Sequence, residues 1–244
     1  MDVISFGTDG WRDTLDAFTD ERVRIVGQAV ADYLTDEGHD DPVIVGYDAR
    51  ETSEGFAESL AAVLAGNGFD VVRPERDCPT PLIAYAVVDR GLSGALMVTA
   101  SHNPPEYNGV KFIPSDGAPA LPEVTDAIAA RLAEPDPLPE SEHGTVETVD
   151  LVTPHADRAT ELIDADLSGV TVVHDAMHGS GRGVVDDLLR SAGAEVVSIR
   201  DDRDPEFGGT PPEPSTENLQ PLVDAVDAHD AELGVANDGD ADPV

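Results

Sequence analysis

Residues 42–47, Pro-Val-Ile-Val-Gly-Tyr, form a short apolar run with helical patterns on both sides. Before this run, residues 19–34 begin with Thr-Asp-Glu and then repeat apolar side chains every three or four positions, which is typical of an amphipathic helix. After the run, Ser53 can cap a second helix over residues 53–64. A buried strand between two helices is the repeating unit of α/β folds. Residues 42–47 therefore predict a strand in a mostly parallel sheet.

The alternation of strands and helices continues on both sides of the proline-rich, polar residues 134–144, which are typical of a linker or domain edge. Further strands are predicted at residues 69–72, 95–98, 170–174, 194–199 and 233–236, and further helices at 81–88, 183–189 and 219–228. We therefore predict an α/β protein with two tandem three-layer α/β/α domains, over residues 1–140 and 150–244. Their sheets are expected to be mixed and mostly parallel.

The charge of the chain limits its partners. Asp and Glu number 50 against 14 Lys and Arg in 244 residues, for a formal net charge of -36. Nucleic acid and anionic membranes would repel such a surface. The acidity is spread along the whole chain and Lys111 is the only lysine, which indicates adaptation to high salt and a haloarchaeal type of source. The alternative is an ordinary acidic protein of a mesophile.

Cysteine usage and hydropathy suggest the compartment. Cys78 is the only cysteine, so no internal disulfide can form and a reducing cytoplasm is expected. A buried structural thiol is favoured over a nucleophile. No segment is apolar over the length that a bilayer span needs, and residues 1–6 lack a basic leader pattern. A soluble, cytoplasmic protein is therefore predicted.

Residues 99–111, Thr-Ala-Ser-His-Asn-Pro-Pro-Glu-Tyr-Asn-Gly-Val-Lys, follow a predicted strand and are interpreted as a loop. Ligands of open α/β sheets bind beyond the carboxyl ends of the strands, although these residue types also form ordinary surface turns. The side chains of adjacent Ser101 and His102 diverge in most backbones, so His102 is disfavoured as the base of a hydrolase triad. Ser101 is a better candidate for a phosphoryl carrier than for an acyl nucleophile.

Two other segments are candidates for binding. Residues 237–242, Asn-Asp-Gly-Asp-Ala-Asp, follow a predicted strand and offer the oxygen ligands that Mg²⁺ prefers. Alternating acids recur at residues 202–206, which we interpret as a solvated loop. Residues 6–12, Phe-Gly-Thr-Asp-Gly-Trp-Arg, place Arg12 to hold phosphate by two bonds; the alternative is a glycine-rich turn with Trp11 in the core. In residues 174–181, a strand-to-helix turn is favoured over a metal site.

These three elements, in this order, resemble the α-D-phosphohexomutase family, which includes phosphoglucomutases, phosphomannomutases and phosphoglucosamine mutases. Residues 6–12 match its N-terminal signature, 99–111 its phosphoserine loop and 238–242 its metal loop. A weaker match runs from residues 204–207 to residues 217–219. The resemblance implies that residues 1–140 are domain I with the phosphoserine loop and that 150–244 are domain II with the metal loop.

The resemblance also implies the roles of single residues. Ser101 would carry the phosphoryl group, and Mg²⁺ would bind Ser101 together with Asp238, Asp240 and Asp242. Arg12 would stabilise the transferring phosphate. Lys111 would serve as general acid or base, or as a charge on the reacting oxygen; a base role needs a pKa below the ordinary value of about 10.4. His102 would position the loop or assist proton transfer, and Asn103 would contact substrate or phosphate.

The implied reaction interconverts hexose 1-phosphate and hexose 6-phosphate, with hexose 1,6-bisphosphate as the phosphorylating activator. Trp11 and the Pro-Glu-Tyr at residues 105–107 favour glucose and mannose phosphates; phosphoglucosamine mutase is the alternative, as is a non-catalytic phosphosugar-binding or interaction fragment. The family has third and fourth domains, which we expect this chain to lack, along with the last strand of domain II. The chain alone would then be nearly inactive, and a separate chain could supply the rest. Pro243 stands where the family has arginine.

Overall fold

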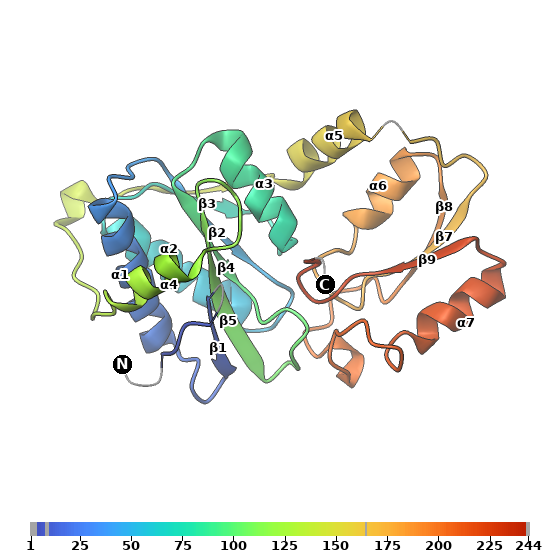
Figure 1. Ribbon diagram of the computed structural model, residues 1–244, viewed down its shortest axis with the longest axis horizontal. Helices are drawn as coiled ribbons and strands as arrows, with labels where there is room; N and C mark the ends of the chain where they lie inside the picture. The colour runs from blue at the N-terminus through green and yellow to red at the C-terminus, as the bar shows by residue number, and fades with distance from the viewer. Residues whose placement is uncertain (1–3, 8–9, 164, 243–244) are drawn as a thin grey trace.

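A computed structural model describes residues 4–7, 10–163 and 165–242. It confirms an α/β protein in which two layered units lie side by side (Figure 1). The first unit contains strands β1 (Gly10–Thr14), β2 (Val43–Tyr47), β3 (Val71–Pro74), β4 (Gly94–Val98), β5 (Tyr107–Pro114) and β6 (Val146–Val149). Its helices are α1 (Asp20–Asp36), α2 (Ser53–Gly66), α3 (Thr80–Arg90) and α4 (Pro122–Ala129), and α5 (Val152–Leu162) leads to the second unit.

The first sheet has the strand order β1-β5-β4-β2-β3-β6. Strands β2, β3, β4 and β6 are parallel, as the alternation with helices predicts, whereas β5 is antiparallel to both β4 and β1. The prediction of one continuous loop over residues 99–111 is wrong in its second half, because β5 begins at Tyr107. Lys111 therefore lies on a strand, opposite Met97 of β4 and Gly10 of β1.

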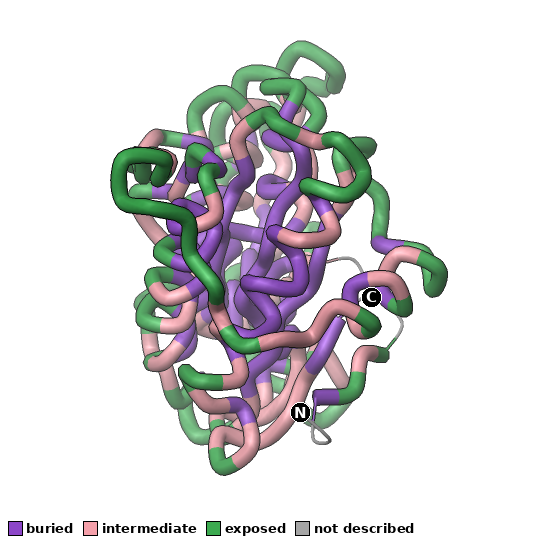
Figure 2. Tube along the Cα trace, turned by 90° about the vertical axis from the view of Figure 1, so that its left-hand side faces the viewer, coloured by how far each residue is buried: buried purple, intermediate pink, exposed green. Residues whose placement is uncertain are grey.

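Alternate side chains of the first sheet pack on opposite faces, and the buried strands run through the middle of the unit (Figure 2). On one face, Val43, Val45 and Leu96 pack against α1 and α2. On the other, Ile44 and Met97 pack against α3. This period-2 alternation between two apolar layers is what a sheet covered on both sides requires. It explains why residues 42–47 are apolar throughout rather than alternating with polar residues.

The first unit extends further than residue 140. Strand β6 pairs with β3 in the first sheet, and residues 134–144 run back along α2, where Leu138 N donates to Gly66 O at 2.9 Å and Gly144 N donates to Ala65 O at 2.9 Å. Residues 134–144 are thus an edge of the first unit rather than a linker between two units. The sequence gives little sign of β6, because this strand is only four residues long and largely exposed, so no buried apolar run marks it.

The second unit has a parallel sheet in the order β8-β7-β9, built from β7 (Thr171–Asp175), β8 (Glu195–Ile199) and β9 (Leu233–Ala236). Helices α6 (Val185–Ser191) and α7 (Gln220–His229) cover its opposite faces (Figure 1). These elements agree with the strands and helices predicted from the apolar runs. Among the described residues, no helix combines the length and apolarity that a membrane span requires.

Buried polar contacts join the two units. Arg182, ahead of α6, donates to both carboxylate oxygens of Asp77 at 2.6 and 2.7 Å, and both side chains are at least nine-tenths buried. Thr80, the first residue of α3, donates from its backbone to Asp240 O at 2.8 Å and from its hydroxyl to Asp240 Oδ2 at 2.7 Å. Bidentate, desolvated pairs of this kind fix orientation as well as distance. The carboxyl ends of β4 and β9 consequently face each other.

Candidate active site

Ser101 lies three residues beyond the end of β4, in a tight turn. Its backbone has the left-handed φ of 52°, and its N–H donates to Thr99 Oγ1 at 2.8 Å. The side chain is 6% exposed, and Oγ donates to Asp238 Oδ2 of the second unit at 2.6 Å. His102 Nδ1 is 3.5 Å from the same Oγ, a separation beyond that of a good hydrogen bond. The geometry places Ser101 against a carboxylate, and His102 beside it without close contact.

Arg50 holds the Ser101 turn by hydrogen bonds to its backbone oxygens. Its guanidinium donates to the backbone oxygens of Ser101 at 2.9 Å, Asn103 at 2.7 Å, Pro104 at 2.7 Å and Tyr107 at 3.2 Å. Its Nε donates to Asp48 Oδ2 at 3.0 Å. Asn103, predicted to contact substrate, thus holds Arg50 through its backbone oxygen. The planar fork of arginine matches this ring of acceptors, which a lysine could not reach at once.

Asp48 completes the support beneath the turn. It is fully buried and accepts hydrogen bonds from Arg50, from Ser53 Oγ at 2.5 Å and from Thr99 Oγ1 at 2.8 Å. Burial raises the pKa of Asp48, and the charge of Arg50 opposes that rise. Ser53, predicted as a cap of α2, instead donates its hydroxyl to this carboxylate. Asp48 and Arg50 were not among the residues predicted from sequence, although they lie one and three residues after β2, at the ligand-binding edge of the sheet.

A loop of the second unit contacts Arg50 through Phe207 and Arg203. The ring of Phe207 lies 5.0 Å from the Arg50 guanidinium carbon, a cation–π contact. Arg203 donates to Arg50 O at 3.2 Å. Residues 202–206, interpreted from sequence as a solvated acidic loop, therefore lead into a buried contact at Phe207, which is 1% exposed.

The acidic loop, residues 237–242, follows β9 and reaches Ser101 across the junction of the two units. Asp238 and Asp240 are buried, at 1% and 0% exposure. A Cβ at Gly239 would lie 2.6 Å from Ser101 O, closer than side chains tolerate, so glycine is what allows the loop to lie on the Ser101 turn. Burial, with the neighbouring charge of Asp240, raises the pKa of Asp238 to about 7.

Lys111 projects from β5 into the same cluster. Its Nζ is 3.2 Å from Asp240 Oδ2 and 3.0 Å from Asp242 Oδ2, and the side chain is buried. Burial alone favours the neutral amine, but the two carboxylates outweigh it and raise the pKa of Lys111 above its ordinary value. A base role for Lys111 needs the opposite shift. The arrangement instead keeps Lys111 positively charged at neutral pH.

Arg12 enters the cluster from β1, where it pairs with Gly109 of β5. A Cβ at Gly109 would lie 2.7 Å from Arg12 Cγ, so this glycine makes room for the arginine stem. Trp11, its neighbour, is 1% exposed and packs on Phe18 at 4.5 Å between ring centroids. Residues 6–12 therefore supply a core residue, Trp11, and a cation near the site, Arg12. Its Thr8 and Asp9 lie outside the described residues, as does Pro243 after the acidic loop.

The acidic loop suits a hard cation in its donor chemistry. Carboxylate and hydroxyl oxygens are the ligands that Mg²⁺ prefers. Asp240 Oδ1 is a buried acceptor with no hydrogen-bond partner among the described residues, which a cation would satisfy. In the described part of the chain, no three acidic, histidine or cysteine side chains already stand together as ligands of one ion. Asp242 is turned toward Lys111. The ligand set of Ser101, Asp238, Asp240 and Asp242 therefore stays a prediction.

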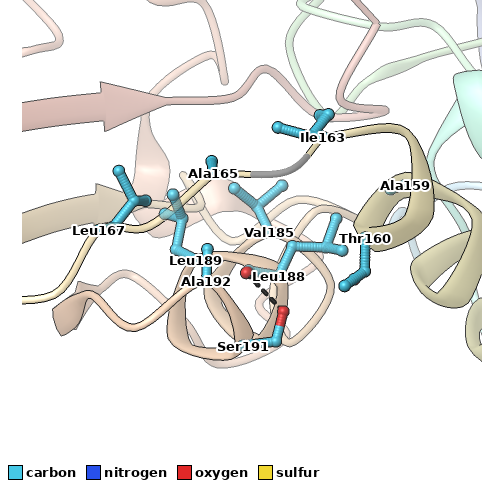
Figure 3. A pocket seen from close by; sticks show the side chains of 10 residues that line it. All are labelled: Ala159, Thr160, Ile163, Ala165, Leu167, Val185, Leu188, Leu189, Ser191 and Ala192. Atoms are coloured by element: carbon cyan, nitrogen blue, oxygen red, sulfur yellow. Dashed lines mark hydrogen bonds between the residues drawn. The ribbon is translucent and has the colours of Figure 1, made fainter.

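Two hollows bear on where a substrate could enter. One of about 170 Å³ lies between α3 and β5, with Lys111 and Asp242 in its wall. Another of about 360 Å³ lies between α5 and α6, where Figure 3 shows Ile163, Leu188 and other side chains without ionisable groups. The residues that line the second hollow include no charged group that could bind a phosphate. The first hollow adjoins the charged cluster at Lys111 and Asp242.

Comparison with known families decides the kind of site. Residues 3–138 match the family described as phosphoglucomutase/phosphomannomutase, alpha/beta/alpha domain I, and residues 153–244 match its alpha/beta/alpha domain II. The chain belongs to the phosphoglucomutase/phosphomannomutase family. The resemblance to this family inferred from residues 6–12, 99–111 and 238–242 is confirmed.

The relatives of this chain carry several names. It is 37% identical over 242 residues to a probable phosphoglucosamine mutase of Methanopyrus kandleri, covering 98% of this chain and 52% of the relative. It is 34% identical to a phosphoglucomutase/phosphomannomutase of Thermococcus kodakarensis, covering 97% and 53%. A putative phosphomannomutase from Thermus thermophilus superposes with a TM-score of 0.89 at 35% identity, covering 98% and 55%. The chain thus spans about half the length of the curated relatives it matches.

Proposed function

We propose that this chain carries the phosphoserine half of a phosphohexomutase site, with Ser101 as the phosphoryl carrier. The observation that supports this most directly is the contact of Ser101 Oγ with Asp238 Oδ2 at 2.6 Å, next to the buried amine of Lys111. A hydroxyl, acidic oxygens and a fixed cation within one buried cluster are what positioning and electrostatic stabilisation of a phosphoryl group demand.

In the proposed transfer, a hexose 1,6-bisphosphate gives one phosphoryl group to Ser101. The bond from phosphorus to the sugar oxygen breaks, a bond to Oγ forms, the serine hydroxyl loses its proton and the sugar oxygen gains one. Lys111, held protonated by Asp240 and Asp242, supplies positive charge and a donor for that sugar oxygen. Arg50 keeps Ser101 in place throughout, because its four carbonyl contacts fix the turn.

Mg²⁺ would be held by Asp238, Asp240 and Asp242 with Ser101, where it would neutralise negative charge on the phosphoryl oxygens. Glucose and mannose phosphates are the proposed substrates. Mutase turnover is proposed for the chain together with the further segments that its relatives possess, since about half of their length lies outside the match. A cytoplasmic enzyme fits the buried free thiol of Cys78.

The test is transfer of a phosphoryl group to the purified chain. Incubation with glucose 1,6-bisphosphate and Mg²⁺ should add the mass of one phosphoryl group, located on Ser101 by peptide mass spectrometry. Ser101→Ala should take up none, whereas Ser115→Ala, at an exposed serine just after β5, should behave as wild type. Phosphorylation that persists in Ser101→Ala would contradict the proposal. Glucose or mannose 1,6-bisphosphate should act faster than glucosamine 1,6-bisphosphate.

A further inference from the structure

His174 is a fully buried histidine on β7 that the proposed transfer does not use. Its Nδ1 lies 2.7 Å from Asp186 Oδ1, and its Nε2 lies 2.8 Å from the side-chain amide oxygen of Asn237. Asn237 is the residue directly after β9 and directly before Asp238. The ring therefore bridges the start of α6 and the start of the acidic loop.

Asp186 fixes how the ring is turned. Its carboxylate also accepts from Ser198 Oγ at 2.6 Å and from Gly183 N at 2.8 Å. Burial by itself raises the pKa of Asp186, but these hydrogen bonds and His174 outweigh it and lower that pKa below its usual value. The Asp186 carboxylate accepts from the Nδ1–H of the ring, and the amide oxygen of Asn237 accepts from its Nε2–H, so the two contacts together fix how the ring is turned.

Asn237 transmits this orientation to the acidic loop. Its backbone N–H donates to Asp175 O at 3.1 Å, and its side chain is held by the ring. The loop then leaves Asn237 in a turn closed by Ala241 N to Asp238 O at 3.3 Å and by Asp242 N to Asp238 Oδ1 at 3.1 Å. A shift of Asn237 therefore moves Asp238, whose partner is Ser101.

We propose that His174 is a positioning residue: through Asn237 it sets where the acidic loop lies against Ser101. The consequence for cation binding rests on the proposed function, whereas the placement of the loop does not. A residue that orients a ligand-bearing loop without touching the ligand acts as an outer-shell partner, whose loss weakens metal affinity.

The placement is tested by hydrogen exchange in the absence of any metal. In His174→Val, the amides of Asn237, Ala241 and Asp242 should exchange about tenfold faster than in wild type, because the hold on the loop is lost. Ser191→Ala is the control: it removes a side-chain hydrogen bond of the same helix α6, from Ser191 Oγ to Leu188 O, without touching His174, Asp186 or Asn237, and its loop should exchange as in wild type. Equal loop exchange in His174→Val and wild type would overturn the proposal.

A second substitution covers the case in which His174→Val fails to fold. Asn237→Ala removes the other partner of the same contact and leaves the His174–Asp186 pair in place, so it should loosen the loop to the same extent. The double variant should be no worse than Asn237→Ala alone, because His174 acts through Asn237. Additive effects of the two substitutions on loop exchange would contradict that route.

Mn²⁺ titration, followed by electron paramagnetic resonance, separates the two proposals. Wild type and Ser191→Ala should bind Mn²⁺ equally, whereas His174→Val and Asn237→Ala should bind it about 10- to 100-fold more weakly. A purely structural role would lower the melting temperature without this change in affinity. Wild type that binds no Mn²⁺ would contradict the metal role of the acidic loop, while loop exchange would still decide the role of His174.

Discussion

Arg50 contacts the turn that carries Ser101 through the backbone oxygens of that turn. A guanidinium that is 1% exposed and satisfied by four carbonyl oxygens and a carboxylate has little freedom to move. The four carbonyl acceptors lie 51 to 57 residues away in the sequence. The turn that carries Ser101 therefore depends on a residue from a different strand.

Replacing Arg50 by lysine should destabilise the protein. Arg50→Lys keeps the charge but leaves several buried carbonyls without a donor, which should lower the free energy of unfolding by about 2 to 4 kcal/mol. Urea denaturation measures this loss. Arg158→Lys is the matched control, because Arg158 forms an exposed pair with Glu161 on α5 and should cost less than about 0.5 kcal/mol. Equal effects of the two substitutions would contradict the role given to Arg50.

Cys78 should be inert in the folded protein. Its thiol is buried, and burial raises its pKa to about 12. The reactive thiolate is therefore about one part in ten thousand at pH 8. Ellman's reagent should react slowly with the native protein at pH 8 and promptly after unfolding in guanidinium, when the pKa falls back to that of a free thiol. Prompt reaction of the native protein would show that the thiol is accessible.

At the residue scale, the sequence is informative where a residue follows closely on a strand. Ser101 follows β4 and Asp238 follows β9, and the structure brings both to one place. Arg50 was missed because its partners are carbonyl oxygens, which every residue has and which leave no pattern. The pKa of Lys111 also depends on two carboxylates more than a hundred residues away, a proximity that only the fold creates.

At the scale of elements, the acidic loop works because it can lie directly on the Ser101 turn. The approach requires glycine at position 239, where a Cβ would meet Ser101 O at 2.6 Å. The two loops come from different sheets, so neither can move to relieve such a clash without breaking contacts of its own. Thr80, on α3, holds the acidic loop from the other side.

Gly239→Ala should therefore separate the loops. We expect a loss of about 1 to 3 kcal/mol in the free energy of unfolding and little transfer of phosphoryl to Ser101, measured by urea denaturation and by mass spectrometry. Gly55→Ala is the control, since a Cβ there meets nothing within 4 Å. Gly55 lies in the first turn of α2, where replacing glycine by alanine should stabilise the protein by up to about 1 kcal/mol. Wild-type phosphorylation of Gly239→Ala would refute the requirement for close approach.

The elements that could be predicted are those marked by an apolar run or a helical spacing of apolar residues. The apolar runs gave β2, β3, β4, β7, β8 and β9, together with helices α1, α2, α3, α6 and α7, and the structure has all of them. Strands β1 and β5 escaped prediction because each contains poor strand formers, Gly10 and Asp13 in β1 and Asn108 and Gly109 in β5. Helix α5, which has no buried residue, was also not predicted.

At the scale of the whole molecule, charge should govern stability. A formal net charge of -36 repels itself in dilute buffer, and the Debye length falls from about 10 Å at 0.1 M salt to about 3 Å at 1 M. The melting temperature should therefore rise with KCl, as measured by circular dichroism. Sucrose at equal osmolality is the control, because it favours burial without screening charge. Full stability in dilute buffer would contradict adaptation to high salt.

The buried pairs between the units also constrain how such a chain can be inherited. Asp77 and Ser101 belong to the first sheet's side of the junction, whereas their partners Arg182 and Asp238 belong to the second. A genetic crossover between β6 and β7 would give a chimera in which each partner had been selected against a different surface. The two units must therefore be inherited together. Exchange of one unit between relatives should be tolerated only where both relatives have the same residues in these pairs.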